Sequence, residues 1–484
     1  MGITYYSTNS KEGKKVSFEE ALLIGLAPDY GLYMVDRNEI PKFTKDEIES
    51  LKGKKYCEIA YQVLSKYLLS EIPEKDLKEL LDDAYLEEKI PTNIQKVNEN
   101  THIMWLTCGP TYSFKDYAAR FFGRTLNYFL GKRGLRRVVV VATSGDTGGA
   151  VADALCGLDN VDNIVFFPKG SISEGQRKQM TTLQKNVYAF EVAGDFDVCQ
   201  SLAKTLLGDK EFAKEVYGDS ERLTSANSIS IGRLLPQSVY PFYAYSKVCC
   251  EFVASIPSGN FGDMMGTVLA KEMGLPIKKI ICGVNENKEF PDFLETGIYT
   301  VNPSVKSPSS AMIVSHPSNL ARLIDFYGGH MYDARDSETK KVITPGVIDK
   351  MPNLEEMRYD LYSISIDNKT HYLTMKEVYE NDNIVLDPHG SVGWRALEIY
   401  RENNNENKKE VGVIYETADP GKFPEDVEKA TGYFPTLPKR MQEQKESEER
   451  IFSINNFPDK TKQGLKLSDA QVLEAKQKIK ELFV

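Results

Sequence analysis

The sequence of 484 residues has few of the features that define several large protein classes. It has five histidines and no HExxH or similar pair, so we expect no metal site. Its seven cysteines are scattered and form no CxxC motif, which predicts reduced thiols in a cytoplasmic protein. No apolar run approaches the roughly 18 residues that span a bilayer, so we expect no membrane segment. The polar start of the chain argues against a secretory signal.

Positive charge is also in deficit. Lysine and arginine number 60 and aspartate and glutamate 70, which gives a net charge of −10 at pH 7. A general nucleic-acid binder needs a basic surface that releases counterions, so we expect no nucleic-acid partner. The hydrophobic fraction of 41% is ordinary for a globular protein, and the length fits two large domains or about three of average size.

Short β-branched apolar runs alternate with helical segments over most of the chain. The runs lack a strict apolar-polar alternation, which is typical of strands buried on both faces. The order of strand, loop and helix predicts α/β architecture with parallel sheets. The expected strands are 138–142, 164–167, 187–192, 251–256, 280–284 and 411–415, and the expected helices include 148–156, 196–207 and 263–273.

The expected organisation is a leading helical domain over 1–95 and two α/β domains over 96–235 and 236–484. In the leading domain the periodicity predicts helices at 18–26 and 56–69. An amphipathic helix is expected to end the chain at 467–482, with Ser468 as its N-cap.

Two glycine-rich loops, TSGDTGG at 143–149 and PSGNFGD at 257–263, follow predicted strands. Such loops place backbone N–H groups at a helix start, where an anion binds. Neither loop is GxGxxG or GxxxxGK[ST], which disfavours a nucleotide-binding kinase or dehydrogenase. A tight turn without a ligand is an equally open interpretation of the first loop. Asp263 can serve simply as an N-cap.

A third loop, GPTYSFKD at 109–116, precedes a predicted helix. Ser113 is its expected N-cap, which places Lys115 in the first turn. The electropositive end of a helix disfavours a charged lysine. The same position suits a lysine that reacts as a neutral amine, as in Schiff-base chemistry. The alternative is a surface lysine whose stem covers the helix end.

Two further segments carry polar side chains that could meet a ligand. Segment 225–233 combines amides, hydroxyls and Arg233, a set able to grip a phosphate. Its simpler interpretation is a capped helix start with an exposed arginine. Thr417, at the end of strand 411–415, offers a hydroxyl to a ligand or is a turn residue.

Five motifs, in chain order, resemble the threonine synthase family, and most closely its long form. They are GPTYSFKD (109–116), SGDTG (144–148), SANSISIGRL (225–234), PSGNFGD (257–263) and ETADPGKF (416–423). VSFEEA at 16–21 and GLY at 31–33 resemble the extra leading domain of that form. The resemblance implies an α/β fold-type II enzyme, similar to tryptophan synthase β, that uses pyridoxal 5′-phosphate (PLP).

The resemblance also implies a role for each matched residue. Lys115 would be the catalytic Schiff-base lysine, and Thr417 would meet the pyridine nitrogen. The cofactor phosphate would be held by Gly259, Asn260, Phe261, Gly262 and Asp263. The substrate carboxylate would meet the loop of Ser144, Asp146 and Thr147, and the substrate phosphate would meet Asn227, Ser228 and Arg233.

The implied reaction converts O-phospho-L-homoserine and water to L-threonine and phosphate. Substrate and cofactor together carry three anionic groups, which matches three donor-rich loops. The sequence departs from the long-form pattern TAHPAKF at Asp419 and Gly421, and from an expected AMD triplet at Ile313. An acid at 419 either weakens binding of the anionic substrate or lies outside the site.

Alternatives remain open at this point. A PLP-dependent phospholyase or a threonine/serine dehydratase would give 2-oxobutyrate instead of threonine. An inactive paralogue would bind a ligand without turning it over. The sequence leaves the oligomeric state open between monomer and homodimer.

Overall fold

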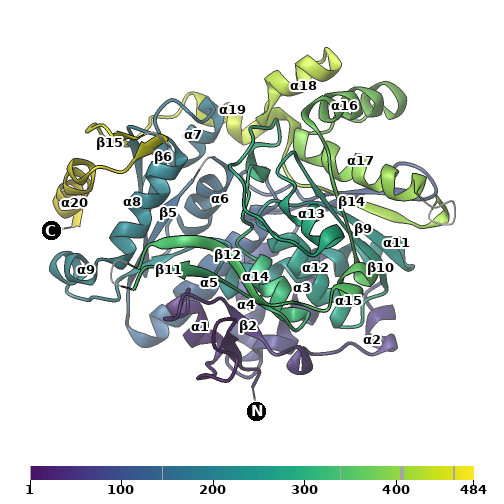
Figure 1. The fold of residues 1–484 in the computed structure, drawn as a ribbon, viewed down its shortest axis with the longest axis horizontal. Helices are drawn as coiled ribbons and strands as arrows, with labels where there is room; N and C mark the ends of the chain where they lie inside the picture. The colour runs from purple at the N-terminus through teal and green to yellow at the C-terminus, as the bar shows by residue number, and fades with distance from the viewer. Residues whose placement is uncertain (1, 144, 338–339, 404–407, 462–463, 484) are drawn as a thin grey trace. The chain divides into compact units, whose positions relative to one another are not determined.

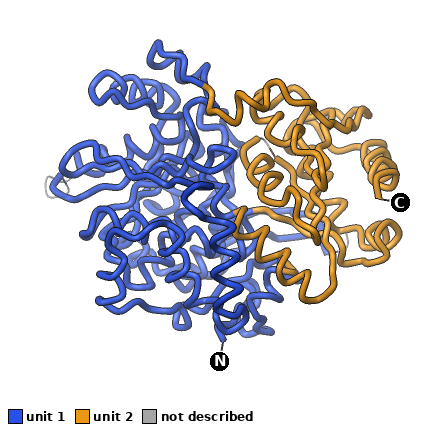
Figure 2. Tube along the Cα trace, turned by 180° about the vertical axis from the view of Figure 1, so that it is seen from behind, with its two compact units in different colours: residues 1–22, 26–118, 228–436 blue, residues 23–25, 119–227, 437–484 orange. Residues whose placement is uncertain are grey.

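The computed structural model describes residues 2–143, 145–337, 340–403, 408–461 and 464–483. Contacts divide the chain into two compact units, shown in different colours in Figure 2. The first unit comprises residues 1–22, 26–118 and 228–436, and the second comprises 23–25, 119–227 and 437–484. Each unit is built on its own sheet of mainly parallel strands.

The sheet of the first unit has six strands in the order β13-β10-β9-β14-β4-β3. Figure 1 labels its strands β9, β10 and β14. All neighbours are parallel except β3 and β4. Gly412 of β14 pairs with Val253 of β9 on one side and Thr101 of β4 on the other. The strands are β3 (Asn93–Lys96), β4 (Thr101–Trp105), β9 (Phe252–Pro257), β10 (Ile277–Val284), β13 (Leu361–Ser365) and β14 (Gly412–Glu416).

Helices cover this sheet and bury its strands. Every residue of β9 and β14 is buried, as the unalternating apolar runs predicted. Helix α17 (Pro388–Glu402) packs on β9, β10 and β14, where Trp394 and Leu397 join alternate strand residues such as Ile281 in one apolar cluster. Helices α11 (Val239–Val248) and α12 (Gly262–Glu272) also pack against β9.

The sheet of the second unit has five parallel strands in the order β15-β7-β6-β5-β8. Its strands are β5 (Arg137–Ala142), β6 (Val161–Pro168), β7 (Val187–Val192), β8 (Leu223–Ser225) and β15 (Ile451–Ile454). Successive residues of β6 point to opposite faces. Ile164 and Phe166 join a cluster with α8 (Phe196–Gly208), whereas Val165 and Phe167 join one with α6 (Asp146–Leu155) and α7 (Glu174–Thr181).

The remaining described elements flank these two sheets. They are β1 (Tyr5–Ser7), α1 (Phe18–Ile24), β2 (Tyr33–Val35), η1 (Arg37–Glu39), α2 (Lys45–Glu49), α3 (Tyr56–Leu68), α4 (Glu74–Tyr85), α5 (Lys115–Arg133), α9 (Lys210–Tyr217), α10 (Ile231–Leu234), η2 (Leu235–Ser238), α13 (Glu289–Thr296), η3 (Ser310–Met312), α14 (Leu320–Phe326), β11 (His330–Arg335), β12 (Val342–Lys350), α15 (Leu354–Asp360), α16 (Asn368–Asp382), η5 (Pro420–Lys422), α18 (Pro424–Thr431), α19 (Lys439–Lys445), β16 (Asp459–Thr461), β17 (Gly464–Lys466) and α20 (Asp469–Phe483).

The predicted strands and helices are confirmed, with ends that differ by a few residues. Ser468 caps α20 as predicted, because Gln471 N donates to its Oγ at 3.3 Å. The region 1–95 is not wholly helical, since it contains the antiparallel pair of β1 and β2 and most of β3. The three predicted domain boundaries stay a prediction. Within the described residues, no helix is long and apolar enough to cross a membrane.

Two leucines of the second unit test how its core stabilises the fold. Leu202 of α8 is fully buried in the apolar cluster on β5 and β6, whereas Leu473 of α20 is 68% exposed. We expect Leu202→Ala to cost about 2–5 kcal/mol of unfolding free energy, because it removes buried apolar atoms and leaves a cavity. The matched Leu473→Ala should shift the urea midpoint far less. Equal shifts would contradict this assignment of the core.

Candidate active site

Three loops leave neighbouring strands of the first-unit sheet at their carboxyl ends. Residues 106–114 follow β4, 258–261 follow β9, and 417–419 follow β14. Because β14 lies between β4 and β9 and all three strands are parallel, the loops meet at one edge of the sheet. This edge is where open α/β sheets bind their ligands.

Lys115 is the first residue of α5, and main-chain hydrogen bonds tie the loop before it to the segment after β14. Phe114 N donates to Thr417 O at 2.9 Å, and Asp419 N donates to Tyr112 O at 3.0 Å. These bonds form an antiparallel bridge between Ser113 and Ala418. The backbone at Lys115 is therefore held beside the backbone at Thr417.

The buried carboxylate of Asp116 holds the turn before Lys115. Its Oδ2 accepts from Thr111 N at 2.8 Å, and its Oδ1 accepts from Thr111 Oγ1 at 2.6 Å. A Cβ on Gly109 would lie 2.4 Å from Asp116 Oδ2, so this turn requires glycine. The prediction that Ser113 caps α5 is wrong, because its buried Oγ has no hydrogen-bond partner in the described part of the chain.

The loop between β9 and α12 presents a row of backbone donors. Ser258 N donates to Gly283 O at 3.0 Å, but the next four N–H groups, those of residues 259–262, have no acceptor among the described residues. Phe261 has a φ of 60°, in the left-handed region, and α12 begins at the next residue. A Cβ on Gly259 would lie 2.7 Å from Ala311 O, so only glycine fits there. This is the geometry of an anion cradle.

Asp263 lies inside the first turn of α12, so the alternative interpretation of Asp263 as a simple N-cap is wrong. Its Oδ1 accepts from Ser258 Oγ at 2.5 Å and from Met264 N at 2.8 Å, which closes the loop on itself. Burial raises the pKa of Asp263, and the positive charge of Lys115 acts on it in the opposite direction. Lys115 is therefore electrostatically coupled to the anion cradle.

Arg233 is buried in the short helix α10, with only 4% of its surface exposed, so its interpretation as an exposed arginine is wrong. Burial lowers its pKa to about 10, which leaves it protonated at neutral pH. Gln237 links Arg233 to the cradle: its Nε2 donates to Arg233 O at 2.8 Å, and its amide packs against Gly262.

The other predicted phosphate-binding residues lie on both sides of a boundary between units. Ser228 belongs to the first unit, and its Oγ lies 2.9 Å from Ser318 Oγ. Asn227 belongs to the second unit, where its N–H donates to Ser225 Oγ at 3.2 Å. The structure brings Lys115, the cradle, Thr417, Ser228 and Arg233 into one unit.

The loop 143–149 lies in the second unit, and two of its N–H groups are bonded to one of its own side chains. Gly145 N and Gly148 N both donate to Thr143 Oγ1, at 2.9 and 2.8 Å. These two N–H groups are therefore bonded within the loop, and anion binding by the rest of the loop stays a prediction. Asp146 begins α6, and its Oδ1 accepts from Gln176 Nε2 at 3.1 Å. Ser144 lies outside the described residues, and the role of Thr147 stays a prediction.

A buried acid directly precedes Thr417. Glu416 Oε1 accepts from Asp387 N at 2.8 Å, and its Oε2 has no hydrogen-bond partner within the described residues. Burial and the negative charge of Asp387 raise the pKa of Glu416 well above its usual value. Glu416, directly before Thr417, therefore holds its proton more strongly than an ordinary glutamic acid.

The sequence analysis missed the pair of Asp387 and His389. This pair is bonded to the segment that packs against Gly259 of the cradle. His389 Nδ1 lies 2.5 Å from Asp387 Oδ2, and its Nε2 accepts from Ala311 N at 3.1 Å. Ala311 O is the atom that a side chain at position 259 would strike. The signal in the sequence was Asp387-Pro388-His389, where an aspartate before a proline marks the start of helix α17.

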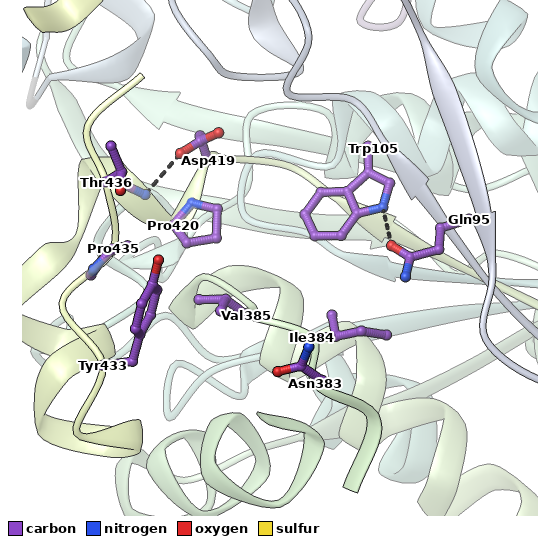
Figure 3. A pocket seen from close by; sticks show the side chains of 11 residues that line it. Gln95, Trp105, Asn383, Ile384, Val385, Asp419, Pro420, Tyr433, Pro435 and Thr436 are labelled. Atoms are coloured by element: carbon purple, nitrogen blue, oxygen red, sulfur yellow. Dashed lines mark hydrogen bonds between the residues drawn. The ribbon is translucent and has the colours of Figure 1, made fainter. Parts of the chain in front are cut away.

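The Asp419 carboxylate faces a separate cavity of about 360 Å³ (Figure 3). Its Oδ1 accepts from Gly421 N at 2.8 Å, and burial raises its pKa. The cavity is lined by Gln95, Trp105, Asn383, Ile384, Val385, Asp419, Pro420, Gly421, Tyr433, Pro435 and Thr436. None of the predicted cofactor residues lines it. Ile313, the second departure, ends η3, where its N–H donates to Ser310 O at 3.3 Å.

These residues fit a phosphorylated pyridine cofactor. Four unpartnered N–H groups and a glycine that tolerates no side chain suit a phosphate. The loops that carry an amine at Lys115 and a hydroxyl at Thr417 are bonded to each other along the same sheet edge. The chemistry of this donor set matches PLP.

Comparisons with known proteins match most of the chain. The family model "Threonine synthase N terminus" matches residues 4–85, "Pyridoxal-phosphate dependent enzyme" matches 89–345, and "Threonine synthase, C-terminal" matches 391–463. The threonine synthase of Pseudomonas aeruginosa is 35% identical over 469 residues, which are 93% of this chain and 96% of the relative. That of Saccharomyces cerevisiae is 34% identical over 89% of each chain.

Solved structures agree with the sequence relatives. The PLP-bound threonine synthase from Brucella melitensis superposes with a TM-score of 0.86 and 30% identity, covering 100% of both chains. The threonine synthase from yeast superposes with a TM-score of 0.84 and 28% identity, over 100% of this chain and 99% of that chain. The predicted fold class is therefore confirmed, and the chain belongs to the threonine synthase family of pyridoxal-phosphate-dependent enzymes.

Proposed function

We propose that this protein converts O-phospho-L-homoserine and water to L-threonine and phosphate, with Lys115 as the catalytic residue. The observation that carries the proposal is the row of four unpartnered N–H groups at 259–262, on a loop coupled to Lys115. A site of this kind binds a phosphate next to an amine that reacts with a carbonyl.

The first unit carries a candidate residue for each group that PLP needs. The N–H groups of Gly259, Asn260, Phe261 and Gly262 would hold the cofactor phosphate, with Asp263 bracing the loop. Thr417 would meet the pyridine nitrogen, and Lys115 would bind the cofactor covalently. When bound, PLP supplies an electron sink that stabilises negative charge at the substrate α carbon. The raised pKa of Glu416, directly before Thr417, disfavours a negative charge there that would stabilise a protonated ring nitrogen.

Lys115 would remove the α proton and move protons at the β carbon, where water then adds. Its place at the start of α5 favours the neutral amine that this task requires. Arg233 would pair with the substrate phosphate and neutralise it as it leaves the γ carbon, with Ser228 and Asn227 as further donors. The loop of Ser144, Asp146 and Thr147 would meet the substrate carboxylate.

Several further assignments are also proposals. We keep the three-domain division at 1–95, 96–235 and 236–484, whose first boundary lies near the end of one family-model match and the start of the next. We also propose a cytoplasmic location, which agrees with seven cysteines that remain free thiols. The oligomeric state, monomer or homodimer, is decided by light scattering.

A two-product assay tests the reaction. With O-phospho-L-homoserine we expect threonine to exceed 2-oxobutyrate, and Lys115→Ala to lose at least about 10²-fold in rate, since general acid-base catalysis contributes that much. Lys132→Ala, an exposed lysine in the last turn of the same helix, is the matched control and should retain full activity. Dominant 2-oxobutyrate would instead show a phospholyase, and a wild type that takes up no PLP would show an inactive paralogue.

Gly259→Ala tests the cradle through cofactor binding alone. The added Cβ would lie 2.7 Å from Ala311 O and 3.0 Å from Met312 Cα, both backbone atoms, so the loop has to move. Such crowding costs about 1–3 kcal/mol, which predicts a PLP dissociation constant roughly ten times higher. Gly208→Ala, at a helix end with open space around it, should leave the constant unchanged. Equal PLP dissociation constants for Gly259→Ala and Gly208→Ala would contradict the assignment of residues 259–262 as the phosphate-binding loop.

A further inference from the structure

Arg322 of α14 is the largest fully buried side chain of the described residues, and it has no acidic partner among them. Its donors meet neutral oxygens instead. Nε and Nη2 donate to Tyr33 O at 3.0 and 2.8 Å, Nη2 also donates to Ile229 O at 2.6 Å, and Nη1 donates to Asn319 Oδ1 at 2.6 Å. Burial lowers its pKa to about 9, so it carries its charge at neutral pH. A buried charge without a counter-ion is costly and is found where it serves a function.

Asn319 extends this arrangement to both phosphate-binding segments. Its Nδ2 donates to Ser228 O at 3.3 Å and to Asn260 O at 3.0 Å, and its main-chain N donates to Asn260 O at 3.2 Å. Ser318 N donates to Asn260 Oδ1 at 3.3 Å. One short segment therefore joins the loop proposed for the substrate phosphate to the cradle proposed for the cofactor phosphate.

The bonded carbonyls fix the direction of the neighbouring N–H groups. In a planar trans peptide the C=O and the following N–H point in opposite directions. The oxygens of Ser228, Ile229 and Asn260 all point to the pair of Arg322 and Asn319. The N–H groups that follow them, at positions 229, 230 and 261, therefore point away from this pair, and none of the three has an acceptor among the described residues.

We infer that Arg322 is a positioning residue for both phosphate groups. Directly at Ile229 and through Asn319 at Ser228 and Asn260, it aims three peptide N–H groups at anions. The positive charge of Arg322 has no acidic partner among the described residues, so it favours a phosphate dianion at each site. A bound phosphate would act as its counter-ion. The inference rests on the proposed function and adds to it a residue that lies outside the five sequence motifs.

The test separates phosphate recognition from general loss of structure. The apo forms of wild type and Arg322→Met are titrated with PLP and with pyridoxal, which lacks the phosphate, and binding is followed by absorbance. We expect Arg322→Met to weaken PLP binding by about tenfold and pyridoxal binding by less than about twofold. Arg322→Lys, which keeps the charge but loses the planar fork, should recover part of the difference. Equal losses for both ligands, or no loss for PLP, would overturn the inference.

Two further variants keep the test decisive. Arg358→Met is the matched control, because Arg358 likewise donates to main-chain oxygens, those of Leu294 and Glu295, away from the cradle. It should leave the ratio of the PLP affinity to the pyridoxal affinity unchanged. If Arg322→Met does not fold, Asn319→Ala is the smaller change. It removes the side-chain bonds to Ser228 O and Asn260 O and should reduce the ratio of the PLP affinity to the pyridoxal affinity. A wild type that binds no PLP would refute the proposed function. A wild type that binds PLP, with variants whose ratio of PLP affinity to pyridoxal affinity is unaltered, would refute this inference alone.

Discussion

The candidate site depends on two main-chain hydrogen bonds between the loop after β4 and the segment after β14. A parallel sheet brings the carboxyl ends of its strands to one edge, but nine loop residues separate β4 from Lys115. The bonds from Phe114 N to Thr417 O and from Asp419 N to Tyr112 O fix the backbone before that lysine relative to the segment that follows β14. The amine and the hydroxyl proposed for the two ends of the cofactor are therefore placed by backbone geometry, not by side-chain contacts alone.

Charge within the first unit is arranged for an anionic ligand, although the chain as a whole carries −10. Burial raises the pKa of Glu416 beside Thr417, while it lowers the pKa of Arg233 to about 10 and that of Arg322 to about 9. Both arginines stay charged at neutral pH, because the ordinary pKa of an arginine is high enough to tolerate a fall of several units. Local donors thus oppose the repulsion that an acidic protein exerts on a phosphate ester.

Two glycine-rich loops that look alike in the sequence differ in the structure. In 143–149 the hydroxyl of Thr143 accepts from two of the loop's own N–H groups, whereas in 257–263 the corresponding donors have no partner among the described residues. Composition predicts the turn and the helix start in both loops. It does not predict whether a neighbouring hydroxyl turns inward, because that depends on the rotamer and on the packing around it.

The sequence by itself determined the α/β class, the strands buried on both faces, and the motif residues that the family shares. These follow from local periodicity and from short patterns, which need no knowledge of distant neighbours. Only the tertiary structure decided that Ser113 and Asp263 are not helix caps, that Asp419 lines a cavity apart from the predicted cofactor residues, and that Arg322 reaches the loops proposed to bind phosphate. Arg322 contacts Tyr33 and Ile229, which lie 289 and 93 residues away along the chain. Contacts of that range are set by how the elements pack, and no local pattern encodes them.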